Sequence, residues 1–224
     1  MRELTLSVTF RVPRLGVERA RSRVPHFQWH EGAEDGHVEQ LDSWDASTIP
    51  DGAAIICRNN APLFSAALKL LSQGRAIKLV GMDIGPGLVR ILRKLGPETA
   101  TAAQVATALD RWMQIELKRA RRQESVVEKV ECLGVLTQGH ATLGDAIHHA
   151  EALFRKDGHI QLLSIHKAKG LEFDTVFHLD PWRIPSRFVK SGTEEYEQEL
   201  NCRYVCETRF KRALYLIDLN TFSP

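Results

Sequence analysis

The chain has 224 residues, of which 43% are hydrophobic and 26% are charged, and this length and composition suffice for one large or two small globular domains. No apolar run approaches the roughly 20 residues that a membrane-spanning helix needs, and the N-terminus carries no signal sequence, so we expect a cytoplasmic protein without a membrane partner. The formal net charge of +2 is close to neutral, and bulk charge therefore does not indicate a nucleic-acid partner.

The first half of the chain alternates between a predicted strand, a helix and a second strand. Residues 52–58 form a short apolar run, which predicts a strand buried on both faces. Pro62 suits the first turn of a helix that Gly74 ends, and residues 76–80 read as the next strand. Residues 52–80 therefore have the length expected for a parallel strand-helix-strand crossover.

The middle of the chain is predicted to be helical. We expect helices over residues 88–95, from Val105 into the basic cluster 118–122, and over residues 143–154. Thr142 and Asp145 have capping-box spacing at the start of the last helix, and Gly158 suits its end. The basic cluster could contact nucleic acid or could be only the solvated face of its helix.

Strand signals return at residues 160–165, 175–179 and 214–219, with a helix from about 195 to 212 between the last two. This alternation, interrupted by helices, predicts an α/β fold with a small helical insertion. Residues 30–50 are rich in Gly, Asp, Ser and Glu, and we expect them to form a mobile surface segment.

Four cysteines are too few and too scattered to predict a disulfide framework in a chain of this size. Cys202 and Cys206 could share one helix face, but two ligands do not make a metal site. We therefore expect reduced thiols and no metal ligands.

The sharpest sequence pattern is Ser-Ile-His-Lys-Ala-Lys-Gly-Leu-Glu-Phe at residues 164–173. It follows a predicted strand, and so it places polar and cationic groups at the carboxyl edge of a parallel sheet, where ligands of α/β folds bind. Gly170 would allow close backbone approach, and Glu172 could accept hydrogen bonds from sugar hydroxyls.

This segment resembles motif V of UvrD/Rep-type superfamily 1 DNA helicases, whose usual form is Thr-hydrophobic-His-x-Ala-Lys-Gly-Leu-Glu-Phe. Residues 199–209, built around Tyr-Val-x-x-Thr-Arg, resemble motif VI, and residues 6–11, with an aromatic-Arg pair, resemble motif IV. Residues 56–61 resemble the motif that opens the second motor domain, and residues 81–85 suit the loop after its next strand.

The resemblance implies a recA-like parallel sheet flanked by helices, together with ATP, Mg²⁺ and single-stranded DNA as ligands. Arginines suit charge neutralisation at a transferred phosphate, and by motif position these catalytic arginines would be Arg11 and Arg209. The nucleotide would be bound by Gly170 and Glu172. Contacts to the DNA phosphate backbone would come from Arg58, Asn59, Ser164 and His166.

Each of these residues also has a plainer interpretation. Arg209 alone could be a surface ion-pair partner, and Arg11 could simply end a strand. His166 could be a packed histidine. Arg58 and Asn59 could merely lead from a strand into the following helix.

The sequence contains no Gly-x-x-x-x-Gly-Lys-Ser/Thr, the loop that holds phosphates and magnesium in such motors. We therefore expect one side of an ATP cleft, negligible ATP hydrolysis by the chain alone, and a P-loop-bearing helicase polypeptide as partner. The alternative is a noncatalytic remnant or accessory module that binds DNA or protein. An unrelated α/β nucleotide-binding protein would need residues 81–87 as its phosphate loop, where Pro86 removes a backbone donor.

The predicted division has three parts. Residues 1–49 form an N-terminal segment with the motif IV-like strand and the mobile region. Residues 50–96 and 159–224 form the recA-like domain, and residues 97–158 form the helical insertion.

Overall fold

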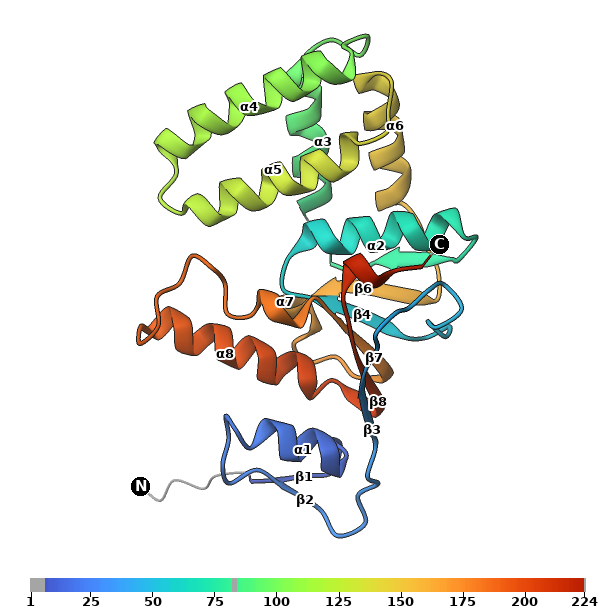
Figure 1. Ribbon diagram of the computed structural model, residues 1–224, viewed down its shortest axis with the longest axis vertical. Coiled ribbons are helices and arrows are strands. Elements are labelled where there is room, and N and C mark those ends of the chain that lie inside the picture. Colours follow the sequence, from blue (N-terminus) through green and yellow to red (C-terminus); the bar gives the residue numbers. More distant parts are fainter. Residues whose placement is uncertain (1–6, 82–83, 224) are drawn as a thin grey trace.

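Six parallel strands form one sheet in the order β3-β8-β7-β4-β6-β5 (Figure 1). The strands are β3 (His37–Gln40), β4 (Ala54–Cys57), β5 (Ile77–Leu79), β6 (Ile160–Ser164), β7 (Phe173–Leu179) and β8 (Phe210–Ile217). This computed structural model describes residues 7–81 and 84–223. Leu6 of the motif IV-like segment, and Met82 and Asp83 of the loop that follows β5, lie outside the described residues.

β4 lies in the middle of the sheet, between β6 and β7. All four of its residues are buried, which confirms the strand predicted from the apolar run. β4 and β5 run parallel, as a crossover connection requires, but β6 lies between them. The two strands of the predicted crossover unit are therefore in one sheet without being neighbours.

One face of the sheet is covered by α2 (Asn60–Ser72), and a layer of four helices packs beyond it (Figure 1). The four are α3 (Ile84–Leu95), α4 (Ala102–Arg119), α5 (Gln123–Thr137) and α6 (Leu143–Phe154). The Thr142 hydroxyl accepts a hydrogen bond from the Asp145 backbone at the start of α6, as the capping spacing predicts. The helical insertion is confirmed, and α3 packs with it, while the domain boundary at residue 96 stays a prediction.

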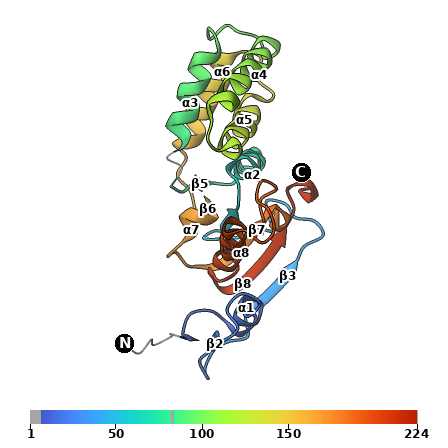
Figure 2. The ribbon, with the colours of Figure 1, turned by 90° about the vertical axis from the view of Figure 1, so that its left-hand side faces the viewer.

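The other face of the sheet carries α7 (Ile165–Ala168) and the long helix α8 (Glu194–Glu207). α1 (Arg14–Ala20) packs against α8, and β1 (Val8–Thr9) pairs with β2 (Gln28–Trp29) in a separate two-stranded sheet. Figure 2 shows this N-terminal part at one end of the molecule and α3 to α6 at the other. Two short 3₁₀ helices, at Pro181–Arg183 and Leu219–Thr221, complete the elements.

The structure corrects two expectations. Residues 30–50 are not simply a surface segment, because β3 pairs with β8 and because Trp44 and Ile49 are buried. β3 is an edge strand and has few apolar residues, so its sequence gives no strand signal within this polar stretch. The predicted helix over 195–212 ends at Glu207, since Phe210 already pairs with Phe173 in the sheet.

Within the two described stretches of chain, no helix is long and apolar enough to span a membrane.

Candidate functional site

Glu172 is the centre of a charged cluster where β7 and β8 begin. Its Oε1 lies 3.0 Å from Nη1 of Arg11, and its Oε2 lies 3.5 Å from Nζ of Lys211. Partial burial opposes ionisation of Glu172, but the hydrogen bonds and charges of Arg11 and Lys211 outweigh it and hold the pKa below its usual range. The cluster thus joins segments 161 positions apart in the sequence around one carboxylate.

Arg209 lies beside this cluster but does not project from it. Its side chain is held by the backbone and by one hydroxyl: Nε donates to the Val205 carbonyl at 2.9 Å, Nη2 to Thr208 Oγ1 at 3.0 Å and Nη1 to the Leu171 carbonyl at 3.4 Å. The residue is only 7% exposed. Burial first, and then the charge of Arg11, lowers the pKa of Arg209. The structure therefore brings together Arg11, Glu172 and Arg209, with the Arg209 side chain bonded mainly to backbone carbonyls.

Phe10 and Lys211 belong to the same place and were not predicted as site residues. Phe10 is 82% exposed and stacks on His30, with ring centroids 5.1 Å apart. Phe10, Arg11, His30 and Lys211 line a cavity of about 180 Å³. Lys211 lies only two positions after Arg209 in the sequence, but it is in β8 whereas Arg209 directly precedes that strand. Gly170 has φ of +89°, and a Cβ there would meet nothing within 4 Å, so its backbone is accessible.

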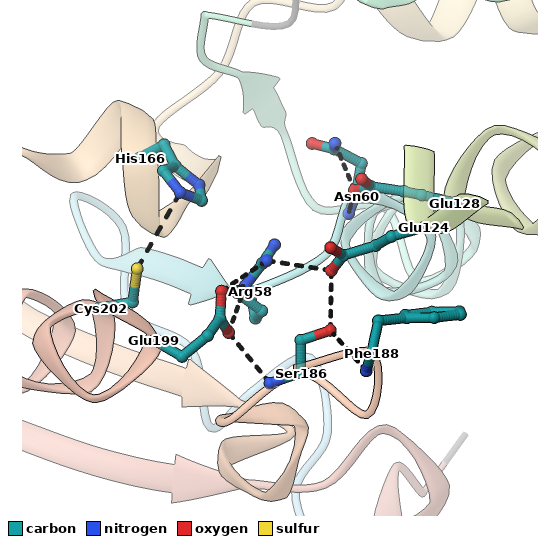
Figure 3. Close-up of polar contacts among 9 residues, drawn as sticks. All are labelled: Arg58, Asn60, Glu124, Glu128, His166, Ser186, Phe188, Glu199 and Cys202. Carbon is teal, nitrogen blue, oxygen red and sulfur yellow. Dashed lines mark hydrogen bonds and ion pairs between the residues drawn. The ribbon is translucent and has the colours of Figure 1, made fainter. Parts of the chain in front are cut away.

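Arg58 lies in a second site, where it is held by two carboxylates (Figure 3). Its Nε donates to both oxygens of Glu199, at 3.0 and 2.8 Å, and its Nη2 lies 2.7 Å from Glu199 Oε1 and 3.1 Å from Glu124 Oε1. Ser186 completes the network, with its backbone N–H donating to Glu199 and its hydroxyl to Glu124. β4, α5, α8 and the β7–α8 loop, residues 180–193, are therefore tied together at one point.

Arg58 belongs to this network, and the other three predicted DNA-contacting residues do not form one continuous row with it. Arg58 and His166 line a cavity of about 590 Å³, and Asn59 lines a neighbouring cavity of about 300 Å³. His166 is exposed on α7, with Nε2 4.0 Å from Cys202 Sγ. Ser164 directly precedes α7 and is outside both linings. Two neighbouring carboxylates offset the charge of Arg58, which the sequence did not reveal.

In the described part of the chain, no group of three or more His, Cys, Asp or Glu side chains is arranged to hold a metal ion. The four cysteines are free thiols.

The chain matches the family of UvrD-like helicase C-terminal domains over residues 108–221, which is just over half of its length. The protein named "Putative ATP-dependent DNA helicase YjcD" from Bacillus subtilis is 30% identical over 139 residues, and DNA helicase II from Rickettsia typhi is 28% identical over 127 residues. These alignments cover 56% and 50% of this chain but only 18% and 19% of the relatives, so the chain spans less than a fifth of their length.

Among solved structures, the C-terminal domain of a possible DNA helicase from Lactobacillus plantarum WCFS1 aligns with 96% of this chain and 91% of that one, with a TM-score of 0.43 and 13% identity. The family match includes the segments with His166, Glu172 and Arg209, whereas Arg11 and Arg58 precede it. Because the match covers more than half of the sequence, this chain belongs to the family of UvrD-like helicase C-terminal domains.

Proposed function

We propose that this chain supplies one side of an ATP cleft and part of a single-stranded DNA path in a DNA-translocating or unwinding motor. A P-loop-bearing helicase polypeptide supplies the other side. The observation that carries the proposal is the convergence of Arg11, Lys211 and Arg209 near Glu172, which brings together three segments of the chain, at residues 11, 172 and 209–211. Such a motor works inside the cell, in agreement with the expected cytoplasmic location.

The cluster suits a nucleotide chemically. Arginine side chains stay charged and can form paired hydrogen bonds to phosphate oxygens, so Arg11 and Arg209 would offset the charge that develops on the terminal phosphate. Glu172 and the Gly170 backbone would contact the sugar side, and the exposed ring of Phe10 offers a surface for the base. Mg²⁺ would supply positive charge beside the phosphates, and its protein ligands would come from the P-loop polypeptide.

On the DNA path, His166, Ser164 and Asn59 would contact backbone phosphates and grip the strand without reading its sequence. Arg58 would join them only after a phosphate displaces Glu199 or Glu124 from its guanidinium. The path and the cleft are connected by α8, which carries Glu199 at one site and leads directly to Arg209 at the other.

One observation favours the alternative, a noncatalytic accessory module that binds DNA or protein. Among the described residues, the Arg209 side chain donates hydrogen bonds to Val205, Leu171 and Thr208, and it is buried. A catalytic arginine must leave at least part of this arrangement to reach a phosphate, whereas an accessory module would retain it.

The proposal is tested by tagging the chain in its native host, purifying it gently and assaying the eluate for a P-loop polypeptide and for DNA-stimulated ATP hydrolysis. We expect both, and we expect Arg209→Ala to lower kcat by about 10³-fold or more while DNA binding is retained. Arg212→Ala is the matched control, since this neighbouring arginine is exposed. An unchanged rate for Arg209→Ala rules out its catalytic role, and a chain that emerges alone and inert supports the accessory module.

A further inference from the structure

The cavity of about 590 Å³ is bordered by two segments outside the helicase-like motifs. Arg122 reaches it from the α4–α5 turn, residues 120–122, and Lys190 from the β7–α8 loop. His166 of α7 also lines it. A single DNA strand that contacts His166 would therefore pass between the turn and the loop. Figure 1 shows these two segments near each other beside α7.

The charges that line this cavity are arranged unevenly. At its base, Arg58 is paired with the carboxylates of Glu199 and Glu124, so these three side chains together carry no excess positive charge. At the rim, Arg122 and Lys190 are exposed and make no ion pair within the described residues. The same holds for Arg121 of the turn and for Lys118 and Arg119 at the end of α4. The positive charge available to a polyanion is thus on the two rims, with only Glu195 among the lining carboxylates outside the Arg58 network.

Phe188 lies where this cavity meets the neighbouring one of about 300 Å³, since it lines both. The residue is 43% exposed although its backbone is held in place. Its N–H donates to Ser186 Oγ at 3.4 Å, and Ser186 is itself bonded to Glu199 and Glu124 (Figure 3). Arg187 lies over this ring, 5.1 Å from its centroid, and is itself paired with Glu131. An exposed aromatic ring on a fixed loop, in a cavity that unpaired cations also line, is typical of a surface on which single-stranded bases stack.

We propose that the α4–α5 turn and the β7–α8 loop form a grip for single-stranded nucleic acid. Arg122 and Lys190 bind backbone phosphates from opposite rims of the cavity, and Phe188 stacks on a base at the passage between the two cavities. This inference rests on the proposed DNA path and extends it to residues that the motif resemblance does not include. For Arg122 of the basic cluster 118–122, the grip implies a nucleic-acid contact.

The test is a fluorescence anisotropy titration of the whole chain with a labelled oligothymidylate at several salt concentrations. Each phosphate contact that is lost should reduce the slope of log affinity against log salt by about 0.7, so the double variant Arg122→Ala/Lys190→Ala should lose about 1.4 of the slope. Phe188→Ala should weaken binding by roughly 10-fold with an unchanged slope, because stacking releases no counterions.

The matched control is Arg90→Ala/Lys94→Ala, which removes the same charge from exposed positions of α3 outside both cavities. Thermal melting confirms that each variant remains folded. Equal salt slopes for the two double variants overturn the grip, as does a Phe188→Ala variant that binds with wild-type affinity. If the rim variants bind normally but His166→Ala weakens binding, the DNA path stands without the grip. Failure of the unmodified chain to bind the oligonucleotide overturns both.

Discussion

Arg58 and Glu199, 141 positions apart in the sequence, form a two-pronged ion pair with side chains only 11% and 9% exposed. Burial disfavours the charged form of Arg58, but Glu199 and Glu124 outweigh it and raise the pKa of the guanidinium above its usual range. The pair connects the end of β4 to the middle of α8, and Ser186 attaches the β7–α8 loop to the same carboxylate. Its loss should therefore affect both the stability of the sheet and the shape of the cavity.

Glu199→Ala should lower the free energy of unfolding by about 3 kcal/mol, because it leaves a buried arginine with one carboxylate and the Ser186 backbone N–H without its acceptor. Urea denaturation measures this directly. Glu18→Ala on α1 is the control, since this carboxylate is exposed and its removal should change the free energy of unfolding by less than about 0.5 kcal/mol. Equal effects of the two substitutions would show that the ion pair contributes nothing.

His178 should make folding stability depend on pH. The residue is fully buried in β7, and neither ring nitrogen has a hydrogen-bond partner among the described residues, since Glu207 Oε1 is 3.9 Å away. Burial first, and then the charges of Arg203 and Arg19, lowers the pKa of His178 from 6.5 to about 3. Between these values the unfolded chain binds one more proton than the folded chain. The free energy of unfolding should thus be unaffected above pH 6.5 and fall below it, by up to about 1.4 kcal/mol per pH unit until pH 3.

The substitution His178→Leu should remove this contribution, so the variant should lose less stability than the unmodified chain when the pH is lowered from 6.5 to 4. At pH 8 it should cost little, because no hydrogen bond is broken. Urea denaturation at several pH values measures both effects. His26→Leu, at an exposed position, should retain the full pH dependence. Parallel curves for His178→Leu and the unmodified chain would contradict the assignment.

Gly158 is required where α6 leads into β6, because a Cβ there would overlap the carbonyl carbon of Ala76 at the start of β5. Gly158→Ala should therefore lower the free energy of unfolding by about 3 kcal/mol through backbone displacement. Gly134→Ala in α5 is the matched control, since a Cβ at that position meets nothing within 4 Å. It should raise the free energy of unfolding by about 0.5 to 1 kcal/mol, through the better helix propensity of alanine. A melting temperature of Gly158→Ala at or above that of Gly134→Ala would refute the close approach.

The sequence predicted those elements whose residue pattern matches their position in the fold. β4 and β6 are apolar runs in the centre of the sheet, and α6 has both its apolar stripe and its cap. β3 was missed because it is an edge strand with three exposed residues out of four. The start of β8 was missed because Lys211 and Arg212 look helical in isolation, and only pairing with β7 fixes them as strand.

For the candidate site, the motif resemblance assigned Arg11 and Arg209 to the terminal phosphate and Glu172 to the sugar side, and in the structure these three residues lie near one another. The roles of these residues stay predictions. The partners of Arg58 could not be read from the sequence, since Glu124 and Glu199 come from helices 66 and 141 positions away. Neither the apolar pattern nor charge spacing specifies contacts between residues so far apart in the sequence, because these contacts depend on how the helices pack.

The position of β6 limits how this protein can be divided. β6 hydrogen-bonds to β4 on one side and to β5 on the other, and both of these strands precede residue 108, where the family match begins. A fragment cut at that residue would leave β6 without either neighbour, with its backbone donors and acceptors unpaired. The family match, residues 108–221, is therefore shorter than the part of the chain that must be synthesised before the sheet can form.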